Sequence, residues 1–302
     1  MKIFNNLNIS KKFKNSVIAI GNFDGIHLGH QKVLRQAKQK ANANKIPFGL
    51  ISFEPMPAMF FNKKLKNHRI NLLHQKIENL KQFKLDFLTN ITFTKKFSNM
   101  SAEKFIEKII YKALNAKYIF VSQNFRFGNR RKGNLNILRK YEKKFNYKTI
   151  ITAPQKRHGK IISSSLIRKK ISMGQIKQAN NLLKRYWAVT GKVIKGRQRG
   201  RKIGFPTCNI KMKNYIIPKL GVYSISAKFG NFNRKGIANI GYRPTFNGQS
   251  LLLETNIFGI NKNLYNKVLN VSFKKFIRPE KKFKNFKYLK KQIKIDIKKA
   301  KK

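Results

Sequence analysis

The stretch over residues 16–53 constrains the fold most, because it alternates an apolar run, a glycine turn, a helical pattern and a second apolar run. The runs Val17–Ile20 and Phe48–Phe53 are typical of buried parallel strands. Between them, over residues 28–44, apolar residues recur at helical spacing. The stretch therefore predicts one βαβ unit, which belongs in a parallel sheet.

The same alternation continues along the first part of the chain. Helical patterns cover about residues 71–83 and 101–115, and β-rich runs begin at Tyr118 and Lys148. Strands that alternate with helices predict an α/β domain with a Rossmann-like, doubly wound parallel sheet. In such a sheet the ligand lies at the carboxyl ends of the strands.

From Trp187 onward the pattern changes to short β-rich runs between glycine and proline turns, after two short helical patterns at 163–174 and 175–183. Six such runs predict a six-stranded antiparallel β-barrel, with a hairpin turn at Gly230-Asn231. A helix from about Lys284 ends the chain. Its apolar stripe is expected to face the barrel and consists of Phe286, Leu289, Ile293 and Ile297.

The length of 302 residues fits two domains, and the change of pattern places them at 1–184 and 185–302. Lys and Arg number 69 against 10 Asp and Glu, which gives a formal net charge of +59. The excess is spread over both parts, with 39 basic against 7 acidic residues up to Lys184 and 30 against 3 after it. Biased codon usage, which favours Lys, Asn, Ile and Phe together, explains this spread. A basic RNA-binding protein is the alternative.

The cysteine and hydropathy patterns predict a cytoplasmic protein. Cys208 is the one cysteine, so no intramolecular disulfide can form, and the five histidines add no zinc-site spacing. The first fifteen residues hold no apolar stretch of signal-peptide length. No run of about 18 apolar residues indicates a membrane span.

The first candidate site is the turn Gly21–His30, with the sequence GNFDGIHLGH, directly after the first predicted strand. Glycines let the backbone approach a phosphate, and the following helix directs free N–H groups at it. The imidazoles of His27 and His30 can stabilise charge at an α-phosphate and on departing pyrophosphate. Half of a metal site or a solvated helix start are the alternatives for this pair.

A second candidate anion site is Ser163–Arg168. The hydroxyls of Ser164 and Ser165 at a helix N-terminus, with the guanidinium of Arg168, form a second cradle for phosphate groups. The alternative is a serine N-cap followed by a solvated basic turn.

The third candidate site is Gly191–Asn209, where glycines and cations can wrap a polyphosphate. Thr207 and Asn209 share one face of an extended segment and offer hard oxygen ligands for Mg²⁺. An RNA-binding basic loop is the alternative. The residues expected to hold the phosphates are Gly196, Gly200, Arg201 and Gly204.

The first part of the chain resembles the nucleotidylyltransferase superfamily in its HxGH signature, and the longer GNFDGIHLGH resembles the FAD synthetase branch. Matching motifs cover most of residues 15–185 and also include Phe53–Pro57, Asn124–Gly128 and Gly159–Arg168. The second part resembles bacterial riboflavin kinase domains nearly from end to end. Its motifs are Pro218–Tyr223, Asn239–Phe246, Leu253-Glu254 and Arg278–Phe283.

The resemblance implies a bifunctional enzyme of flavin cofactor synthesis. Riboflavin and ATP would give FMN and ADP in the barrel, and FMN and ATP would give FAD and pyrophosphate in the sheet domain. ATP is then the co-substrate and Mg²⁺ the cofactor of both reactions, and the partners are small molecules, not nucleic acid or membrane. A nucleotidylyltransferase with a different acceptor is the alternative.

The resemblance also implies roles for single residues. His27, His30 and Arg168 would serve adenylyl transfer, and Glu254 would be the base for the riboflavin hydroxyl, because primary alcohols barely ionise at neutral pH. A paired structural carboxylate is the alternative for Glu254. ATP would be held in the sheet domain by Gly21, Phe23, Asp24, Gly29, Ser164 and Ser165. The flavin would be held by Pro57, Asn124, Phe125 and Arg278.

Five positions depart from the family pattern. Asn124 stands where Asp is usual, and Ser165 stands where Thr is usual. In the second part, Asn256 replaces His, Gly259 replaces Asp, and Asn266 replaces Gly. None of the three changes in the second part removes a proposed base or metal ligand.

Overall fold

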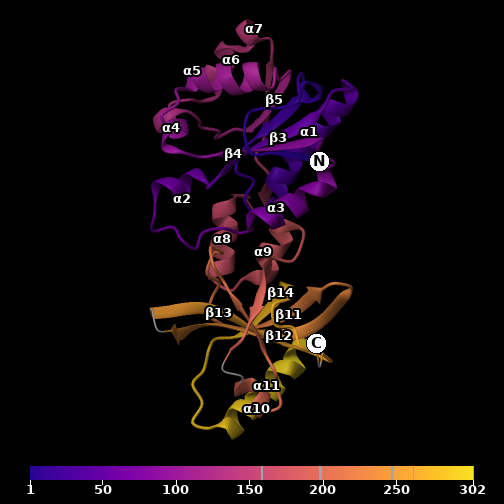
Figure 1. Ribbon diagram of the computed structural model, residues 1–302, viewed down its shortest axis with the longest axis vertical. Helices are drawn as coiled ribbons and strands as arrows, with labels where there is room; N and C mark the ends of the chain where they lie inside the picture. Colours follow the sequence, from indigo (N-terminus) through magenta and orange to yellow (C-terminus); the bar gives the residue numbers. More distant parts are fainter. Residues whose placement is uncertain (158, 197–198, 246–247, 261, 302) are drawn as a thin grey trace. The chain divides into compact units, whose positions relative to one another are not determined.

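The computed structural model describes every residue except 158, 197–198, 246–247, 261 and 302 (Figure 1). The chain forms two compact units. The sheet unit comprises residues 1–65 and 76–163, and the barrel unit comprises residues 66–75 and 164–302. The chain therefore passes between the units three times.

The sheet unit is built on six strands in the order β1-β4-β3-β2-β5-β6. Every neighbouring pair is parallel, which confirms the doubly wound sheet. The strands are β1 (Lys2–Phe4), β2 (Val17–Ile20), β3 (Phe48–Glu54), β4 (Phe87–Thr92), β5 (Tyr118–Ser122) and β6 (Lys148–Thr152). β1 and β4 are not among the predicted strands. In β4 the polar Thr89 and Asn90 interrupt the apolar run, although both side chains are buried.

Helices cover both faces of this sheet, as Figure 1 shows for α1 and α5. The helices of the sheet unit, apart from α3 (Leu73–Leu80), are α1 (Leu28–Ala43), α2 (Pro57–Phe61), α4 (Lys95–Ser98), α5 (Ala102–Phe105), which continues as a π-helix over Ile106–Ala113, α6 (Leu135–Lys140) and α7 (Glu142–Phe145). A short antiparallel pair follows β6 and consists of β7 (Lys156–Arg157) and β8 (Lys160–Ile161).

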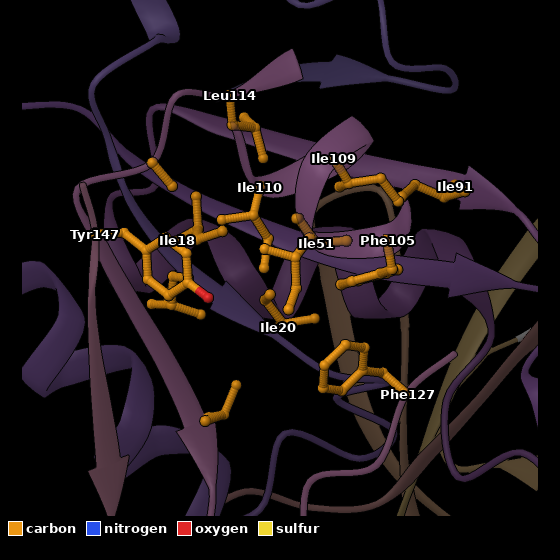
Figure 2. Packing of buried hydrophobic residues seen from close by; sticks show 14 of the residues in the cluster. Ile18, Ile20, Ile51, Ile91, Phe105, Ile109, Ile110, Leu114, Phe127 and Tyr147 are labelled. Atoms are coloured by element: carbon orange, nitrogen blue, oxygen red, sulfur yellow. The ribbon is translucent and has the colours of Figure 1, made fainter. Parts of the chain in front are cut away.

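Alternate residues of the central strands pack into two different cores. Val17 and Ala19 of β2 lie in the core with α1. Ile18 and Ile20 lie in the core on the other face, with α5 and the π-helix (Figure 2). Both faces of the strand are buried, and this is why its sequence is apolar without alternation.

The barrel unit is built on a closed, antiparallel six-stranded barrel in the order β10-β13-β12-β11-β14-β9, as predicted. The strands are β9 (Ala188–Ile194), β10 (Cys208–Lys211), β11 (Gly221–Phe229), β12 (Phe232–Thr245), β13 (Gly248–Ile257) and β14 (Val268–Arg278). Phe229 pairs with Phe232, so the turn at Gly230-Asn231 joins β11 and β12 and that prediction is confirmed. A short helix, α10 (Arg199–Lys202), lies between β9 and β10.

Two helices before the barrel belong to the same unit. They are α8 (Ser164–Ser172) and α9 (Ile176–Leu183), and α9 packs against β14. The segment 66–75 also belongs to it, and α3 (Leu73–Leu80) begins there and ends in the sheet unit. The predicted division into an adenylyltransferase domain, 1–184, and a kinase domain, 185–302, assigns one activity to each part, and it stays a prediction.

The final helix, α11 (Phe286–Lys301), contacts β11, β12 and β14 beside the barrel (Figure 1). Ile293 and Ile297 pack against the barrel, as predicted. Phe286 and Leu289 lie outside this packed cluster and line a cavity of the barrel unit, where Phe286 stays 61 % exposed. In the described part of the chain, no helix has both the length and the apolar character needed to cross a membrane.

Candidate active sites

The turn between β2 and α1 has an unusual backbone. Phe23, Gly25 and Ile26 have φ angles of +48°, +84° and +41°. Positive φ is strained for Phe and more so for a β-branched residue such as Ile, and such strain gathers at functional sites. Asp24 is buried in the same turn, and Gly21 precedes it directly after β2.

His27 and His30 meet at the start of α1. His27 is the N-cap, and its Nδ1 accepts a hydrogen bond from the backbone N–H of His30 at 3.4 Å. The two imidazoles stack with their centroids 3.7 Å apart, and the ring of Phe23 lies 5.0 Å from that of His30. Gly29 leaves room for the ring of His27, because a Cβ there would lie 3.1 Å from Cε1 of His27 and the imidazole would have to shift by a few tenths of an ångström. The structure thus brings the two predicted catalytic histidines together.

Aromatic side chains gather beyond the carboxyl ends of β3 and β4. Phe60, Phe61 and Phe93 contact one another edge to face, with centroids 5.2 Å, 5.3 Å and 5.8 Å apart. Pro57 begins the helix α2 that carries two of them, and Phe61 is 65 % exposed. Nothing in the sequence distinguishes these rings among the 25 phenylalanines of the chain. A planar ligand could stack on them.

Asn124 and Phe125 lie in the loop after β5. Asn124 is exposed, and the half-buried Phe125 stacks on Phe127 with a centroid distance of 5.3 Å. Because β5 and β2 are parallel neighbours, this loop lies at the same edge of the sheet as the turn after β2.

Ser164, Ser165 and Arg168 lie together on the first turns of α8. Ser165 is exposed, whereas Ser164 and Arg168 are half-buried. Nε of Arg168 donates a hydrogen bond to the carbonyl oxygen of His68 at 2.8 Å. One nitrogen of the guanidinium is therefore held by the backbone of its own unit.

The barrel unit contains a cavity of about 970 Å³. All three carboxylates that follow Lys184 line it, namely Glu254, Glu280 and Asp296. The predicted site residues in its lining are Gly196, Gly200, Thr207, Asn209, Glu254 and Arg278. The described lining leaves out the predicted residues Arg201 and Gly204, and Arg197 and Gln198 of the same loop lie outside the described residues.

Three of the lining residues form a row across three strands. Glu254 on β13 pairs with Asn209 on β10 and with Asn239 on β12. Directly paired residues of neighbouring strands present their side chains on one face of the sheet. The row therefore places a carboxylate between two amides in one wall of the cavity.

Arg243 holds the carboxylate of Glu254. Its Nε and NH2 lie 3.1 Å and 3.4 Å from the two carboxylate oxygens, and its NH1 lies 3.8 Å from Oε1 of Glu280. Glu280 Oε1 also accepts a hydrogen bond from Nδ2 of Asn239 at 2.9 Å. No sequence pattern predicts this contact, because Arg243 pairs with Ser250, four positions along β13 from Glu254, and only its long side chain reaches the carboxylate.

Arg278 is bound within the protein. Its Nε and NH2 donate to the carboxylate of Asp296 at 2.8–3.0 Å, and its NH1 donates to the carbonyl oxygen of Pro279. Asp296 is 1 % exposed, so this pair fastens α11 to the end of β14. Arg278 thus lies in the cavity lining while it anchors the final helix.

The segment from Gly196 to Asn209 offers oxygen atoms that could bind a cation. A Cβ at position 196 would lie 2.2 Å from Nδ2 of Asn209, so glycine there lets the Asn209 amide pack against the loop backbone. The hydroxyl of Thr207 and the amide oxygen of Asn209 are hard donors in the same cavity, of the kind that Mg²⁺ takes together with phosphate oxygens. Burial raises the pKa of the Cys208 thiol, which lies between them in sequence and points to the opposite face of β10.

The departures from the family pattern keep the local backbone. Asn266 has a φ of +65°, a conformation that Asn tolerates best after glycine. Gly259 has a φ of +69° and an open space where a Cβ would lie. Nδ2 of Asn256 donates to the carbonyl oxygen of Pro206 at 2.8 Å.

The fold and these sites define a class of protein: a chain that joins a nucleotidylyltransferase-like sheet unit to a kinase-like barrel. A family model described as FAD synthetase matches residues 9–166, and one described as riboflavin kinase matches residues 183–302. The chain belongs to the family of bifunctional riboflavin kinase/FMN adenylyltransferases.

Curated relatives of that name match nearly the whole chain. The relative from Buchnera aphidicola of Schizaphis graminum is 40 % identical over 300 residues, covering 98 % of this chain and 96 % of its own. Those from Haemophilus influenzae and Escherichia coli K12 are 36 % and 32 % identical and cover 97 % and 93 % of this chain, and 96 % and 90 % of their own.

A solved structure shares the fold of both units. The crystal structure of a macrolide-efflux protein from Streptococcus pneumoniae matches with a TM-score of 0.88 and 29 % identity, over 99 % of this chain and 98 % of its own. Its name differs from those of the curated relatives, and we do not apply that name to this chain.

Proposed function

We propose that this chain makes FAD from riboflavin in two steps. The barrel unit transfers the γ-phosphoryl group of ATP to riboflavin, giving FMN and ADP. The adenylyltransferase domain, residues 1–184, then transfers the adenylyl group of a second ATP to FMN, giving FAD and pyrophosphate. The observation that carries the proposal is the barrel cavity, whose lining includes both Glu254 and the loop glycines Gly196 and Gly200.

In the kinase reaction, Glu254 accepts the proton of the riboflavin hydroxyl as that oxygen attacks the γ-phosphorus. A carboxylate in hydrogen-bond reach is the expected base for such an alcohol. Arg243 fixes the plane of the carboxylate through its two-nitrogen contact and keeps the oxygens directed into the cavity. Gly196 and Gly200 let the loop backbone approach the phosphates.

Thr207 and Asn209 would hold Mg²⁺ in the barrel, and bound Mg²⁺ would neutralise charge on the transferring phosphoryl group. The pairing of Asn209 on β10 with Glu254 on the neighbouring strand β13 supports a cation ligand beside the base. Arg278 orients the final helix at the cavity through Asp296, and in that way supports the flavin-binding wall.

In adenylyl transfer, His27 and His30 stabilise charge at the α-phosphate and on the leaving pyrophosphate. Their stacking at the N-terminus of α1 supports this role, because both rings are held before ATP arrives. Ser164, Ser165 and Arg168 bind the outer phosphates. FMN attacks directly through its phosphate oxygen, so no covalent enzyme intermediate is needed.

The flavin ring stacks on the aromatic side chains around Pro57, with Asn124 and Phe125 at the same edge of the sheet. The partners are riboflavin, FMN and ATP, and the reactions take place in the cytoplasm.

Incubation of the purified protein with riboflavin, ATP and Mg²⁺ tests the proposal. Chromatographic separation of riboflavin, FMN and FAD over time should show FMN first and FAD after it. Binding of RNA without any flavin product would instead favour the alternative suggested by the charge of +59.

A further inference from the structure

We propose that residues 66–75, here called the strap, position Arg168 for adenylyl transfer. The barrel residues that bind the strap take part in this positioning. The strap comes from the first half of the sequence but belongs to the barrel unit. The proposal rests on the role of Arg168 given above. It makes Gln75 and Tyr215, which lie in neither candidate site, determinants of the FAD-forming rate.

The strap receives Arg168 at a backbone carbonyl. Nε of Arg168 donates to the carbonyl oxygen of His68 at 2.8 Å, which fixes the direction of the guanidinium. The backbone N–H groups of His68 and Arg69 donate to the carbonyl oxygen of Asn214 at 3.3 Å and 3.0 Å. The N–H of Ile216 donates back to Arg69 at 2.8 Å.

These bonds form a short parallel β-bridge between Arg69 of the strap and Tyr215, which lies in the loop between β10 and β11. The carbonyl that orients Arg168 is therefore held by a loop of the barrel. Trp187 adds a second attachment, since its Nε1 donates to the carbonyl oxygen of Ile70 at 2.9 Å and its side chain is 1 % exposed.

Gln75 fastens the end of the strap with both ends of its amide. Nε2 donates to the carbonyl oxygen of Ala188 at 3.0 Å and to the hydroxyl of Thr190 at 3.1 Å. Oε1 accepts from the hydroxyl of Tyr215 at 2.8 Å and from the backbone N–H of Leu72 at 3.0 Å. The side chain is 7 % exposed, so these bonds have little competition from water.

Tyr215 links the strap to β9. Its hydroxyl also accepts from the backbone N–H of Thr190 at 3.0 Å, and burial raises its pKa, so the phenol stays protonated and able to donate. Loss of this network leaves the carbonyl of His68 less well placed. Small displacements of a charge-stabilising group lower the rate of the chemical step more than they weaken binding.

The test compares full-length Gln75→Met with the unaltered protein. Methionine keeps the length of the side chain and removes all four hydrogen bonds. The kcat of FAD formation from FMN should fall roughly tenfold with a smaller change in KM for ATP. Riboflavin phosphorylation should keep its rate, because the lining of the barrel cavity begins at Gly196, beyond β9.

Ser224→Ala is the matched control. It removes a buried hydrogen bond of the same unit, from the hydroxyl of Ser224 to the carbonyl oxygen of Ala300, far along the chain from the strap. FAD formation should be unaffected by it. If Gln75→Met does not fold, Tyr215→Phe repeats the test, since it keeps the ring and removes only the hydroxyl.

A double-mutant cycle with Arg168→Ala decides how Gln75 acts. If Gln75 works through Arg168, Gln75→Met lowers FAD formation no further once Arg168 is absent. A full additional loss in that background would overturn the proposal and leave the role of Arg168 intact. An unchanged rate in Arg168→Ala alone would overturn the role of Arg168 and the proposal with it.

Discussion

The sheet unit and the barrel unit present different side chains at their candidate sites. The turn after β2 carries two stacked imidazoles, whereas the barrel cavity is lined by every carboxylate that follows Lys184. The difference matches the two acceptors. FMN offers a phosphate that is already an anion, so its site needs charge stabilisation, while riboflavin offers an alcohol that must lose a proton.

Glu254→Gln should have the largest effect, and on the barrel reaction alone. The amide keeps the size of the side chain and removes its basicity, so FMN formation should fall by about 10²–10⁴. FAD formation from supplied FMN should stay near normal, and riboflavin affinity should change little. Both rates and a binding titration measure this. Near-full kinase turnover in the variant would make Glu254 a structural carboxylate held by Arg243.

His30→Ala should have the opposite selectivity. Removing the imidazole takes away a donor to the reacting phosphate, so FAD formation should fall by roughly 10² or more. Riboflavin phosphorylation should survive. Separate assays of the two steps check this, and an equal loss of both would show that the variant is misfolded or that one site serves both reactions.

The βαβ unit, the six β-rich runs and the glycine motifs could be predicted because each is encoded locally, by periodicity or by a turn residue. The row of Asn209, Glu254 and Asn239 could not, because it depends on the register between strands. The partnership of Glu254 with Arg243 is hidden for the same reason. The strap is hidden because residues 66–75 bind a loop about 140 positions further on, which no local pattern records.

Gly196→Ala should sharpen the comparison with a smaller effect. A Cβ would lie 2.2 Å from Nδ2 of Asn209, so the amide must move away from the loop. FMN formation should fall roughly tenfold, with a weaker apparent affinity for Mg²⁺ and ATP, because a displaced ligand costs about one well-made hydrogen bond to a charged group. FAD formation should not change. Titration of Mg²⁺ against both activities measures this, and an unchanged Mg²⁺ dependence would remove Asn209 from the ligand set.

Two fragments of the barrel part test the comparison of the two units, and here we expect the smallest change in activity. The described residues of the cavity lining all lie between Gly196 and Asp296, so fragments 185–302 and 164–302 should both make FMN at comparable rates. They should differ in stability. The longer fragment keeps α9, which buries Ile176, Leu182 and Leu183 and whose Asn180 donates to the carbonyl oxygen of Phe273 and accepts from the N–H of Trp187.

Each fully buried aliphatic side chain contributes about 1.5–3 kcal/mol, so losing α9 should lower the urea midpoint of the shorter fragment clearly. Both fragments lack the strap, so that difference reports on α8 and α9. Equal midpoints would show that the two helices add nothing to the barrel. A well-folded but inactive 164–302 would show that phosphorylation of riboflavin needs more than the barrel cavity, and the contrast between an imidazole site and a carboxylate site would then no longer divide the two reactions.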